Sequence, residues 1–288
     1  MRTTFHAKSA YMDILQRCVQ ELPQHPVRPE RFIWKMKHNK GCISMMTGGQ
    51  KDPDGLEWKN PVIVALGDSV TAGHFECLLP EDPKELARLM QKAQEQIQAG
   101  LELPPIEITD SRECYLEKFR AKLIDKYEQT SVSAINAGIA GDSLIGMSAR
   151  LERDVLRYQP DLVIINGSLN WSEELGTTAE YQALLDQVVQ RIQERTDADI
   201  NLLTPNGDLP NRLFSQGDPL PTKTDERAEA IRQVALKRGV CLADTYRVWE
   251  MARERGCPWE ELLANRINHP SVEGHEVYAQ LLMKLMEE

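Results

Sequence analysis

From Pro61 onward, the chain alternates short runs of β-forming residues with stretches whose apolar residues recur at helical spacing. This alternation constrains the fold more than any other feature, because strands that alternate with helices build a parallel sheet covered by helices on both faces. The sequence therefore predicts an α/β domain, a three-layer α/β/α sandwich around a central, mostly parallel sheet. The expected strands are residues 62–66, 132–136, 161–166, 200–203 and 240–243.

The expected helices are recognised by apolar residues three, four and seven positions apart, which place one apolar face toward the sheet. They lie in residues 144–155, 181–192 and 231–237. A closing helix follows at the end of the chain, and we expect it to pack on the sheet. Its apolar face consists of Tyr278, Leu281, Leu282 and Leu285.

Two regions fall outside the alternation, so we divide the chain into an N-terminal extension (1–60) and a domain (61–288) with an insertion at 77–114. The extension is expected to begin with a helix and to contain the segment 31–36 and the turn-rich residues 47–53; the sequence indicates no role for it. The insertion holds a predicted helix that ends before the breaker Pro104-Pro105, and we expect the insertion to flank or cover a site. The apolar face of that helix is Leu86, Leu89, Met90, Ala93 and Ile97.

Charge excludes several classes of partner. The 288 residues carry a formal net charge of -10, whereas nucleic acids and anionic membranes are bound by clustered Lys and Arg. With 41% hydrophobic residues the chain can bury a large core. We therefore expect a globular protein that binds a small molecule, with no nucleic-acid or membrane partner.

Cysteine usage and the terminus bear on the compartment. The 6 cysteines form no CxxC pair, so neither a zinc site nor a disulfide framework is indicated and reduced thiols are expected. The N-terminus has no apolar stretch of signal-peptide length, and no later segment reaches the roughly 18 apolar residues of a membrane span. The expectation is a cytoplasmic protein.

Polar residues and glycines follow the expected strands in a repeated way. Carboxyl ends of parallel strands open into the crevice where ligands bind, so residues in these places are candidates for a common site. The agreement of several such blocks is more specific than any block alone. The blocks are Gly67-Asp68-Ser69, residues 136–143, residues 167–171, and residues 265–270 ahead of the last helix.

These blocks resemble the SGNH hydrolase superfamily, the GDSL esterases and lipases, whose Ser, Gly, Asn and His come one from each block. The resemblance runs from about residue 61 to the C-terminus. It implies a flavodoxin-like domain with a five-stranded sheet, a nucleophile at Ser69 and a general base at His269. It also implies oxyanion donors at the backbone N–H of Ser69, the backbone N–H of Gly141 and the side-chain amide of Asn170.

The residue types suit acyl transfer without reference to the family. A serine hydroxyl is a poor nucleophile until a positioned base takes its proton, and a neutral imidazole such as that of His269 can do so. The tetrahedral intermediate needs preorganised donors at its oxyanion. The N–H of Gly141 and the amide of Asn170 can supply them, and a helix that begins near Gly141 points its positive end at the developing charge.

The chain departs from the family pattern where an acid should precede the histidine by three or four positions, because Arg266 and Asn265 stand there. Three readings stay open: Asn265 accepts a hydrogen bond from the imidazole, a backbone carbonyl or the distant Asp244 orients the ring, or a Ser-His dyad works alone.

The third block departs as well, with Ser168 in place of a glycine and Trp171 in place of an aspartate. We expect Trp171 to form an apolar or sugar-stacking pocket wall.

Structural roles compete for several of the remaining polar residues. We interpret Asp68 as tying the backbone of its turn, and Asp142-Ser143 as a helix N-cap. His275 is expected to pack on the side of its helix. His74 is placed equally well in the pocket wall or on the surface, and no histidine pair has the spacing of metal ligands.

The sequence thus favours a serine esterase that hydrolyses a small acyl ester, with an O-acetylated carbohydrate as the favoured substrate and no cofactor or metal. The long loop at 204–221 and the insertion are the expected determinants of substrate. A lysophospholipase or thioesterase of the same superfamily is the alternative within hydrolases. A non-catalytic ligand-binding descendant of the fold is the alternative from another class; no oligomeric state is indicated.

Overall fold

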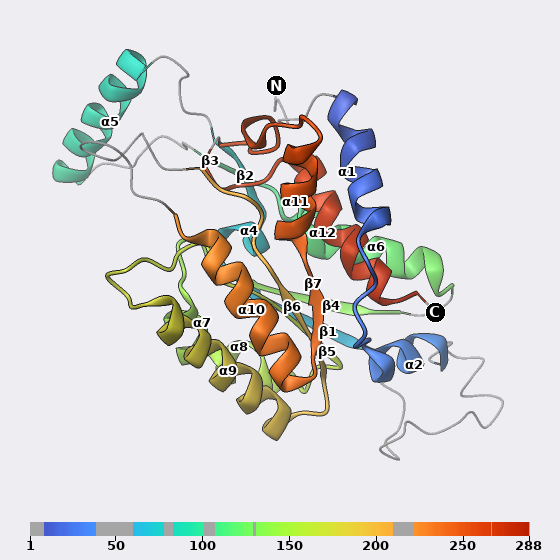
Figure 1. The fold of residues 1–288 in the computed structure, drawn as a ribbon. Helices are drawn as coiled ribbons and strands as arrows, with labels where there is room; N and C mark the ends of the chain where they lie inside the picture. Colours follow the sequence, from blue (N-terminus) through green and yellow to red (C-terminus); the bar gives the residue numbers. More distant parts are fainter. Residues whose placement is uncertain are drawn as a thin grey trace.

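The central sheet has the predicted parallel arrangement. A computed structural model describes residues 9–38, 60–77, 83–100, 107–128, 131–209, 222–265 and 267–287. The strands of the central sheet pair in the order β4-β1-β5-β6-β7, all of them parallel (Figure 1). By position in the chain this order is second, first, third, fourth, fifth, which is the flavodoxin-like order. The strands are β1 (Val62–Gly67), β4 (Ser133–Gly138), β5 (Leu162–Asn166), β6 (Asp199–Leu203) and β7 (Cys241–Ala243).

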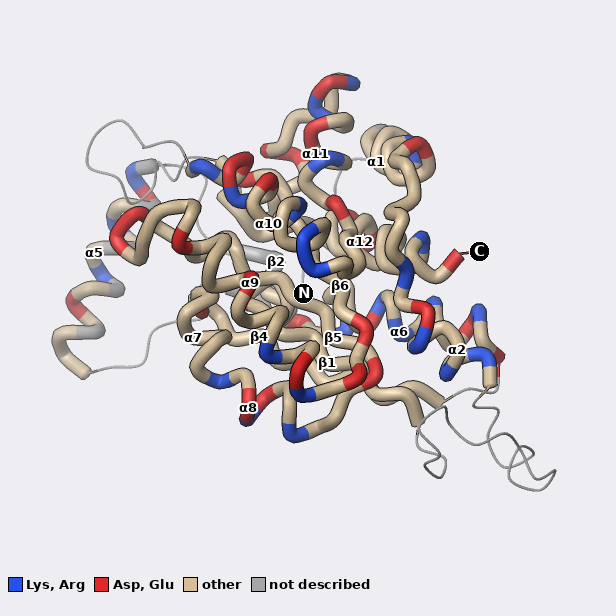
Figure 2. The backbone as a smooth tube through the Cα atoms, turned by 60° about the horizontal axis from the view of Figure 1, so that its bottom comes forward, with Lys and Arg blue, Asp and Glu red and all other residues tan. Residues whose placement is uncertain are grey.

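Alternating side chains of β1 separate the core into two halves. Ile63 and Ala65 belong to one cluster of buried apolar residues, and Val64 and Leu66 belong to the other, as the two-residue period of a strand requires. The first half is covered by α6 (Tyr115–Lys126), α11 (Thr245–Glu254) and α12 (Val272–Leu285), and the second by α7 (Leu144–Ala149), α8 (Leu151–Asp154), α9 (Thr178–Arg195) and α10 (Thr224–Arg238). The three-layer prediction is confirmed (Figure 1). Figure 2 shows charges on the helices and mostly uncharged strands between them.

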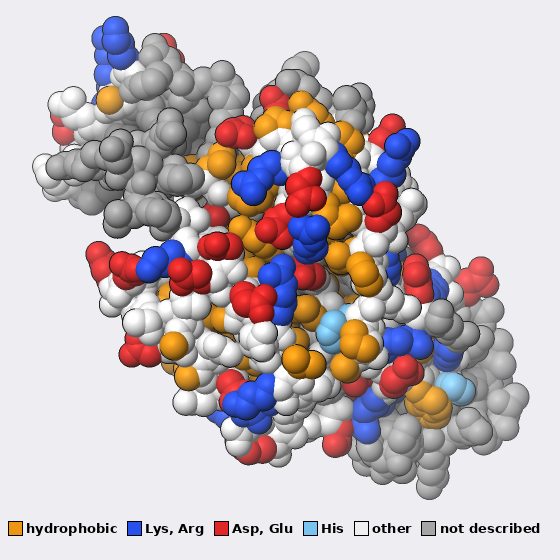
Figure 3. Space-filling model, in the orientation of Figure 1, with side chains coloured by type: hydrophobic (Ala, Val, Ile, Leu, Met, Phe, Trp, Pro, Cys, Tyr) orange, Lys and Arg blue, Asp and Glu red, His pale blue; other side chains and the backbone are white. Residues whose placement is uncertain are grey.

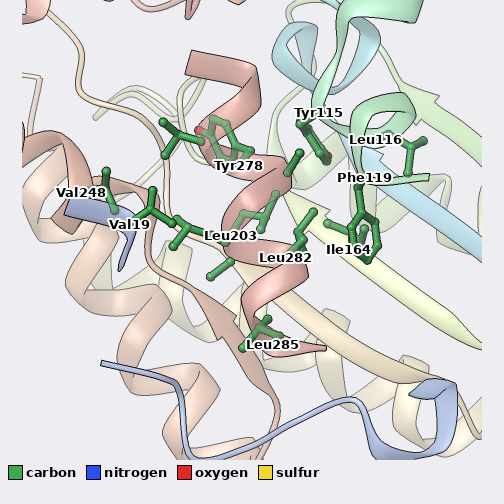
Figure 4. Packing of buried hydrophobic residues seen from close by; sticks show 14 of the residues in the cluster. Val19, Tyr115, Leu116, Phe119, Ile164, Leu203, Val248, Tyr278, Leu282 and Leu285 are labelled. Atoms are coloured by element: carbon green, nitrogen blue, oxygen red, sulfur yellow. The ribbon is translucent and has the colours of Figure 1, made fainter. Parts of the chain in front are cut away.

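The first half of the core is centred on α12. Figure 4 shows side chains from α1 (Ser9–Glu21), α6, α11 and the sheet gathered around this helix, with Leu282 among them and Leu285 below. The rings of Tyr115 and Tyr278 lie 5.4 Å apart. The predicted packing of the closing helix on the sheet is therefore confirmed.

Several helices differ from the prediction. The stretch 144–155 is not one helix, because it breaks at Arg150 into α7 and α8. Neither α6 nor α11 was among the predicted helices. By contrast, α9 and α10 contain the predicted stretches, and α9 begins with a capping box between Thr177 and Glu180.

The N-terminal residues begin with the predicted helix, α1 (Ser9–Glu21), which packs against α11 and α12. It is followed by α2 (Glu30–His38), which includes the segment 31–36. The buried ammonium of Lys35 lies 2.7 Å from Asp161 Oδ1, and the N–H of Phe32 donates to Asp199 Oδ2. Since Asp161 and Asp199 stand where β5 and β6 begin, α2 lies at the amino edge of the sheet. The turn-rich residues 47–53 lie outside the described residues.

The insertion contains the predicted helix as α5 (Pro83–Gln98). It is bordered by β2 (His74–Cys77) and β3 (Glu107–Thr109), which pair antiparallel as a separate small sheet. Figure 1 shows α5 standing apart from the three layers. Pro104-Pro105 lies outside the described residues.

Cys18, Cys114, Cys241 and Cys257 are buried free thiols. On the face drawn in Figure 3, acidic and basic side chains stand next to one another. Within the described ranges, none of the helices has both the length and the apolar character to cross a membrane.

Candidate active site

The serine stands at the turn between β1 and the short helix α4 (Ser69–Ala72). Asp68 caps this helix, because its Oδ1 accepts a 3.0 Å hydrogen bond from Val70 N, as the sequence predicted. Gly67 is required by close packing, since a Cβ there would lie 2.0 Å from Thr71 Oγ1. Because β1 lies between β4 and β5, Ser69 occupies the switch point of the sheet, where ligands bind in this class of fold.

The histidine block meets this turn directly. His269 Nε2 lies 2.9 Å from Ser69 Oγ, although the two residues are 200 positions apart. Each residue is only 6% exposed. The structure therefore forms a buried serine-imidazole pair at the carboxyl edge of the sheet.

A buried asparagine supports the histidine segment. Asn206 Nδ2 donates to the carbonyl of Asn268 at 2.9 Å, and its Oδ1 accepts from the hydroxyl of Tyr278 at 3.1 Å. The carbonyl of His269 also accepts a hydrogen bond from Ala264 N at 2.8 Å. The loop that carries the imidazole is thus tied to α12 and to the end of β6.

The two remaining blocks lie against the nucleophile turn and each other. Gly141, in the loop after β4, has φ +72, a conformation that L side chains rarely adopt, and a Cβ there would meet only open space. Asn170, after β5, donates from Nδ2 to the carbonyl of Asp142 at 3.1 Å. The loop of Gly141 reaches β1 through Ile139 N, which donates to the carbonyl of Gly67 at 3.1 Å.

Asp68 has an unusual environment for a carboxyl group. It is fully buried, and burial raises its pKa to about 7. The hydrogen bond from Val70 N opposes this shift, whereas the nearby carboxylate of Asp142 adds to it. Asp68 therefore takes up a proton in the folded state at a pH where an exposed aspartate is ionised.

We expect Asp68→Asn to remove part of the pH dependence of stability. Between pH 3.8 and about 7 the folded state binds more protons at Asp68 than the unfolded state. The wild-type contribution is therefore fully present below the unfolded pKa and is lost as pH rises through the folded one. Relative to Asp68→Asn, the free energy of unfolding of the wild type should be larger at about pH 4 than at about pH 8, by roughly a few kcal/mol. Urea denaturation at both values measures it, and a difference that does not change with pH would contradict the expectation.

The two candidates for orienting the imidazole are bound elsewhere, which corrects the sequence analysis. Asn265 Oδ1 accepts from three backbone groups, Ile267 N at 3.0 Å, Asn268 N at 2.9 Å and His269 N at 2.8 Å. Asn265 therefore holds the main chain of His269 and not its ring, because the loop turns back over the amide.

Asp244 belongs to a different part of the molecule. Its carboxylate accepts from Arg232 Nε at 2.8 Å and from Thr204 Oγ1 at 2.9 Å. It also caps α11 through Arg247 N at 3.2 Å. Its acceptor atoms are occupied by these groups, so the predicted reach toward His269 is not observed.

Trp171 does not form the predicted stacking wall. It is 7% exposed, and its indole N–H donates to the carbonyl of Gly176 at 2.9 Å. Its ring meets Tyr181 edge to face at 5.4 Å. With so little of the side chain exposed, a sugar has no open ring face on which to stack.

The other histidines divide between site and core. His74 is half-buried, and its ring lies 6.1 Å from that of His269, edge to face, so it lies beside the serine-imidazole pair. His275 is fully buried and accepts from Tyr115 N at 3.2 Å, and burial lowers its pKa to about 3. Packing of His275 is thus confirmed. Among the described residues, no group of three or more His, Cys, Asp or Glu side chains could hold a metal ion.

Sequence reasoning missed Arg150 and Asn206. Arg150 is a buried charge three positions after Met147, on the apolar face of its helical stretch. A charge at such a position was a usable signal, because it must find partners inside the protein. Asn206 lies in an irregular loop, and its sequence context carried no signal.

Most of the chain matches a known protein family in sequence. The model of the GDSL-like Lipase/Acylhydrolase family matches residues 65–277. An acetylxylan esterase of Geobacillus stearothermophilus is 26% identical in an alignment of 171 residues that covers 55% of this chain and 74% of that protein.

Solved structures share the fold at low identity. The acetylxylan esterase Axe2 of Geobacillus stearothermophilus superposes with a TM-score of 0.55 at 20% identity, covering 79% of this chain and 94% of that chain. A putative GDSL-like lipase from Parabacteroides merdae gives 0.57 at 18% identity, covering 79% and 96%. LAE5, an alpha/beta hydrolase enzyme from the metagenome of Lake Arreo, gives 0.55 at 22%, covering 78% and 94%.

Proposed function

This chain belongs to the GDSL-like Lipase/Acylhydrolase family and is a hydrolase of ester bonds, and on that basis we propose that it deacetylates an O-acetylated carbohydrate through an acyl-enzyme on Ser69. The observation that carries the proposal is the 2.9 Å contact between Ser69 Oγ and His269 Nε2. A nucleophile and a base at this separation can exchange a proton without rearrangement.

The proposed reaction has two halves. His269 Nε2 takes the proton of Ser69 as Oγ attacks the acyl carbon, and then gives that proton to the leaving alcohol oxygen as the ester bond breaks. In the second half His269 takes a proton from water, the hydroxide attacks the acetyl-serine, and the returned proton releases Ser69 and acetate. The N–H groups of Ser69 and Gly141 and the amide of Asn170 stabilise both oxyanions.

A small acyl group is proposed because a relative of this chain is named acetylxylan esterase. Ser69 and His269 are each 6% exposed, so only a small part of each residue is open to a substrate. The exposed apolar side chains near Gly141 are Ile139 and Ile145, 43% and 46% exposed.

Within the described part of the chain, an apolar cavity of about 230 Å³ is lined by residues 22–26, 242–244 and α12, and neither Ser69 nor His269 borders it.

The carbohydrate part of the proposal is supported by the relative named acetylxylan esterase. A substrate panel tests it: acetylated xylo-oligosaccharides, p-nitrophenyl acetate, p-nitrophenyl decanoate, an acyl thioester and a lysophospholipid, with released acid measured for each. We expect acetate release from the oligosaccharide and a kcat/KM at least about tenfold higher for acetate than for decanoate. Preference for the decanoate or the lysophospholipid would overturn the substrate proposal.

The absence of a carboxylate at Asn265 also leads to a prediction. In Asn265→Asp the carboxylate should still accept the three backbone hydrogen bonds that Asn265 Oδ1 accepts in the wild type. We therefore expect kcat to change by less than about threefold, whereas Asn265→Ala, which frees the His269 loop, should lower kcat by about tenfold or more. Steady-state kinetics on a short acetyl ester measures both. A large gain in kcat for Asn265→Asp would instead show that the carboxylate reaches the ring.

A further inference from the structure

Arg150 is a buried cation that the proposed reaction does not use. It stands at the break between α7 and α8 and is 8% exposed. Burying a guanidinium is costly unless its N–H groups find acceptors. The hydrogen bonds of its guanidinium go to groups at the carboxyl edge of the sheet and to Asp154 of α8.

These contacts join two strand ends. Arg150 Nη2 donates to the carbonyl of Gly67 at 2.9 Å, and Nη1 donates to the carbonyl of Ala137 at 2.7 Å. Gly67 ends β1 directly before the Asp68-Ser69 turn, and Ala137 is near the end of β4. One planar group thus fixes the spacing between the nucleophile turn and the loop of Gly141, which a point charge could not do.

The same guanidinium holds the residue after Gly141. Nε donates to Asp142 Oδ2 at 2.7 Å, and the carbonyl of Asp142 accepts the amide of Asn170 at 3.1 Å. Gly146 leaves room for this arrangement, because a Cβ there would lie 1.9 Å from Asp142 Oδ1. The groups proposed to bind the oxyanion are therefore connected through Arg150 and Asp142.

We infer that Arg150 is a positioning residue that sets the distances among the oxyanion donors of Ser69, Gly141 and Asn170. The inference rests on the proposed function. Arg150 touches no substrate atom in this role. It acts by holding the ends of β1 and β4 and, through Asp142, the amide of Asn170.

Arg153 provides a matched control. It is three residues away and 64% exposed, and it pairs with Asp154, which Arg150 also contacts. Arg153→Ala therefore removes a neighbouring cation and an ion pair to Asp154 without touching the Gly67, Ala137 or Asp142 contacts. It should leave kcat unchanged.

The test compares Arg150→Ala, Arg150→Lys and Arg153→Ala on p-nitrophenyl acetate, well below the melting temperature of each variant. Arg150→Ala is expected to lower kcat by roughly 10- to 100-fold with KM nearly unchanged, because donors misplaced by about 1 Å stabilise the transition state poorly. The kcat of Arg150→Lys should remain low, since lysine keeps the charge but lacks the planar, forked set of donors of a guanidinium. Millimolar guanidinium ion, but not sodium at equal ionic strength, should partly restore Arg150→Ala and leave Arg153→Ala and the wild type unchanged.

Two outcomes would overturn the inference: wild-type kcat in Arg150→Ala, or a loss of kcat that guanidinium does not restore and that follows the fraction of unfolded protein. The wild type and Ser69→Ala separate this failure from failure of the proposed function. If acetyl ester hydrolysis survives Ser69→Ala, the proposed function fails. If hydrolysis requires Ser69 and only the Arg150 results fail, the inference alone is wrong.

Discussion

Replacement of His269 by glutamine is expected to lower kcat for a short acetyl ester by on the order of 10⁴-fold, with a far smaller change in KM. In the wild type the imidazole lies 2.9 Å from Ser69 Oγ. A glutamine amide cannot take the proton of the serine, so the hydroxyl keeps it and attacks poorly. Binding of the ester should persist, because the substitution preserves much of the side-chain volume.

Two further variants, a control and a second substitution at His269, make the histidine experiment more specific. His38→Gln alters a histidine of α2 at the opposite edge of the sheet, where its Nδ1 lies 2.7 Å from the carbonyl of Trp34, and should leave kcat unchanged. His269→Ala opens a space beside Ser69, so free imidazole should restore part of its activity but none to His269→Gln. A loss below about tenfold in both His269 variants would show that His269 is not the base.

Replacement of Asn170 by alanine is expected to lower kcat by about 10²- to 10³-fold with little change in KM, the usual effect of removing one oxyanion donor. The amide nitrogen carries two hydrogens. One is donated to the carbonyl of Asp142, and the second is the one we assign to the oxyanion. The effect should fall on kcat because the negative oxygen exists only in the transition state and intermediate.

Asn170→Asp is the isosteric partner of this variant. It keeps the shape of the side chain but places a carboxylate where negative charge develops, so its kcat should be no higher than that of Asn170→Ala. Thermal unfolding of both variants checks that the fold is retained. Wild-type kcat in Asn170→Ala would remove this residue from the oxyanion site.

The strands and the convergence of the site blocks were predictable from local sequence. The run Val62–Leu66 is apolar at every position, and the turn residue Gly67 follows it, so the strand and its end could be read directly. Since carboxyl ends of parallel strands share an edge, Ser69, Gly141 and Asn170 were expected on the same edge, and the strand order β4-β1-β5 makes them neighbours there. The direct contact of His269 with Ser69 over 200 positions followed from the resemblance and not from local pattern.

The predictions that were wrong concerned residues whose positions depend on tertiary contacts. Helical spacing predicted one helix over 144–155, but Arg150 turns inward to the carbonyls of Gly67 and Ala137 where that helix breaks. Trp171 belongs to a block that follows a strand end, so the sequence predicted it in the pocket wall. In the structure Tyr181 of α9 packs against its ring instead. No periodicity within either segment contains this information.

For Asn265 the sequence predicted an interaction with His269 but not which atoms of His269 take part. Its distance from His269 along the chain indicated correctly that the two would interact. The spacing did not distinguish ring from main chain, because that depends on how the loop folds back through the Leu263 and Pro270 bridge. The contact to His269 N at 2.8 Å is a property of this loop shape.

Labelling with a fluorophosphonate tests most directly whether Ser69 carries the acyl group. The reagent needs both an activated serine and donors for the developing negative oxygen. We expect one adduct per native chain, located by peptide mass spectrometry on Ser69, with activity on a short acetyl ester lost in proportion and no adduct in Ser69→Ala. Cleavage of the acetyl ester by a chain that forms no adduct at Ser69, or inactivation by an adduct on another residue, would contradict the proposal.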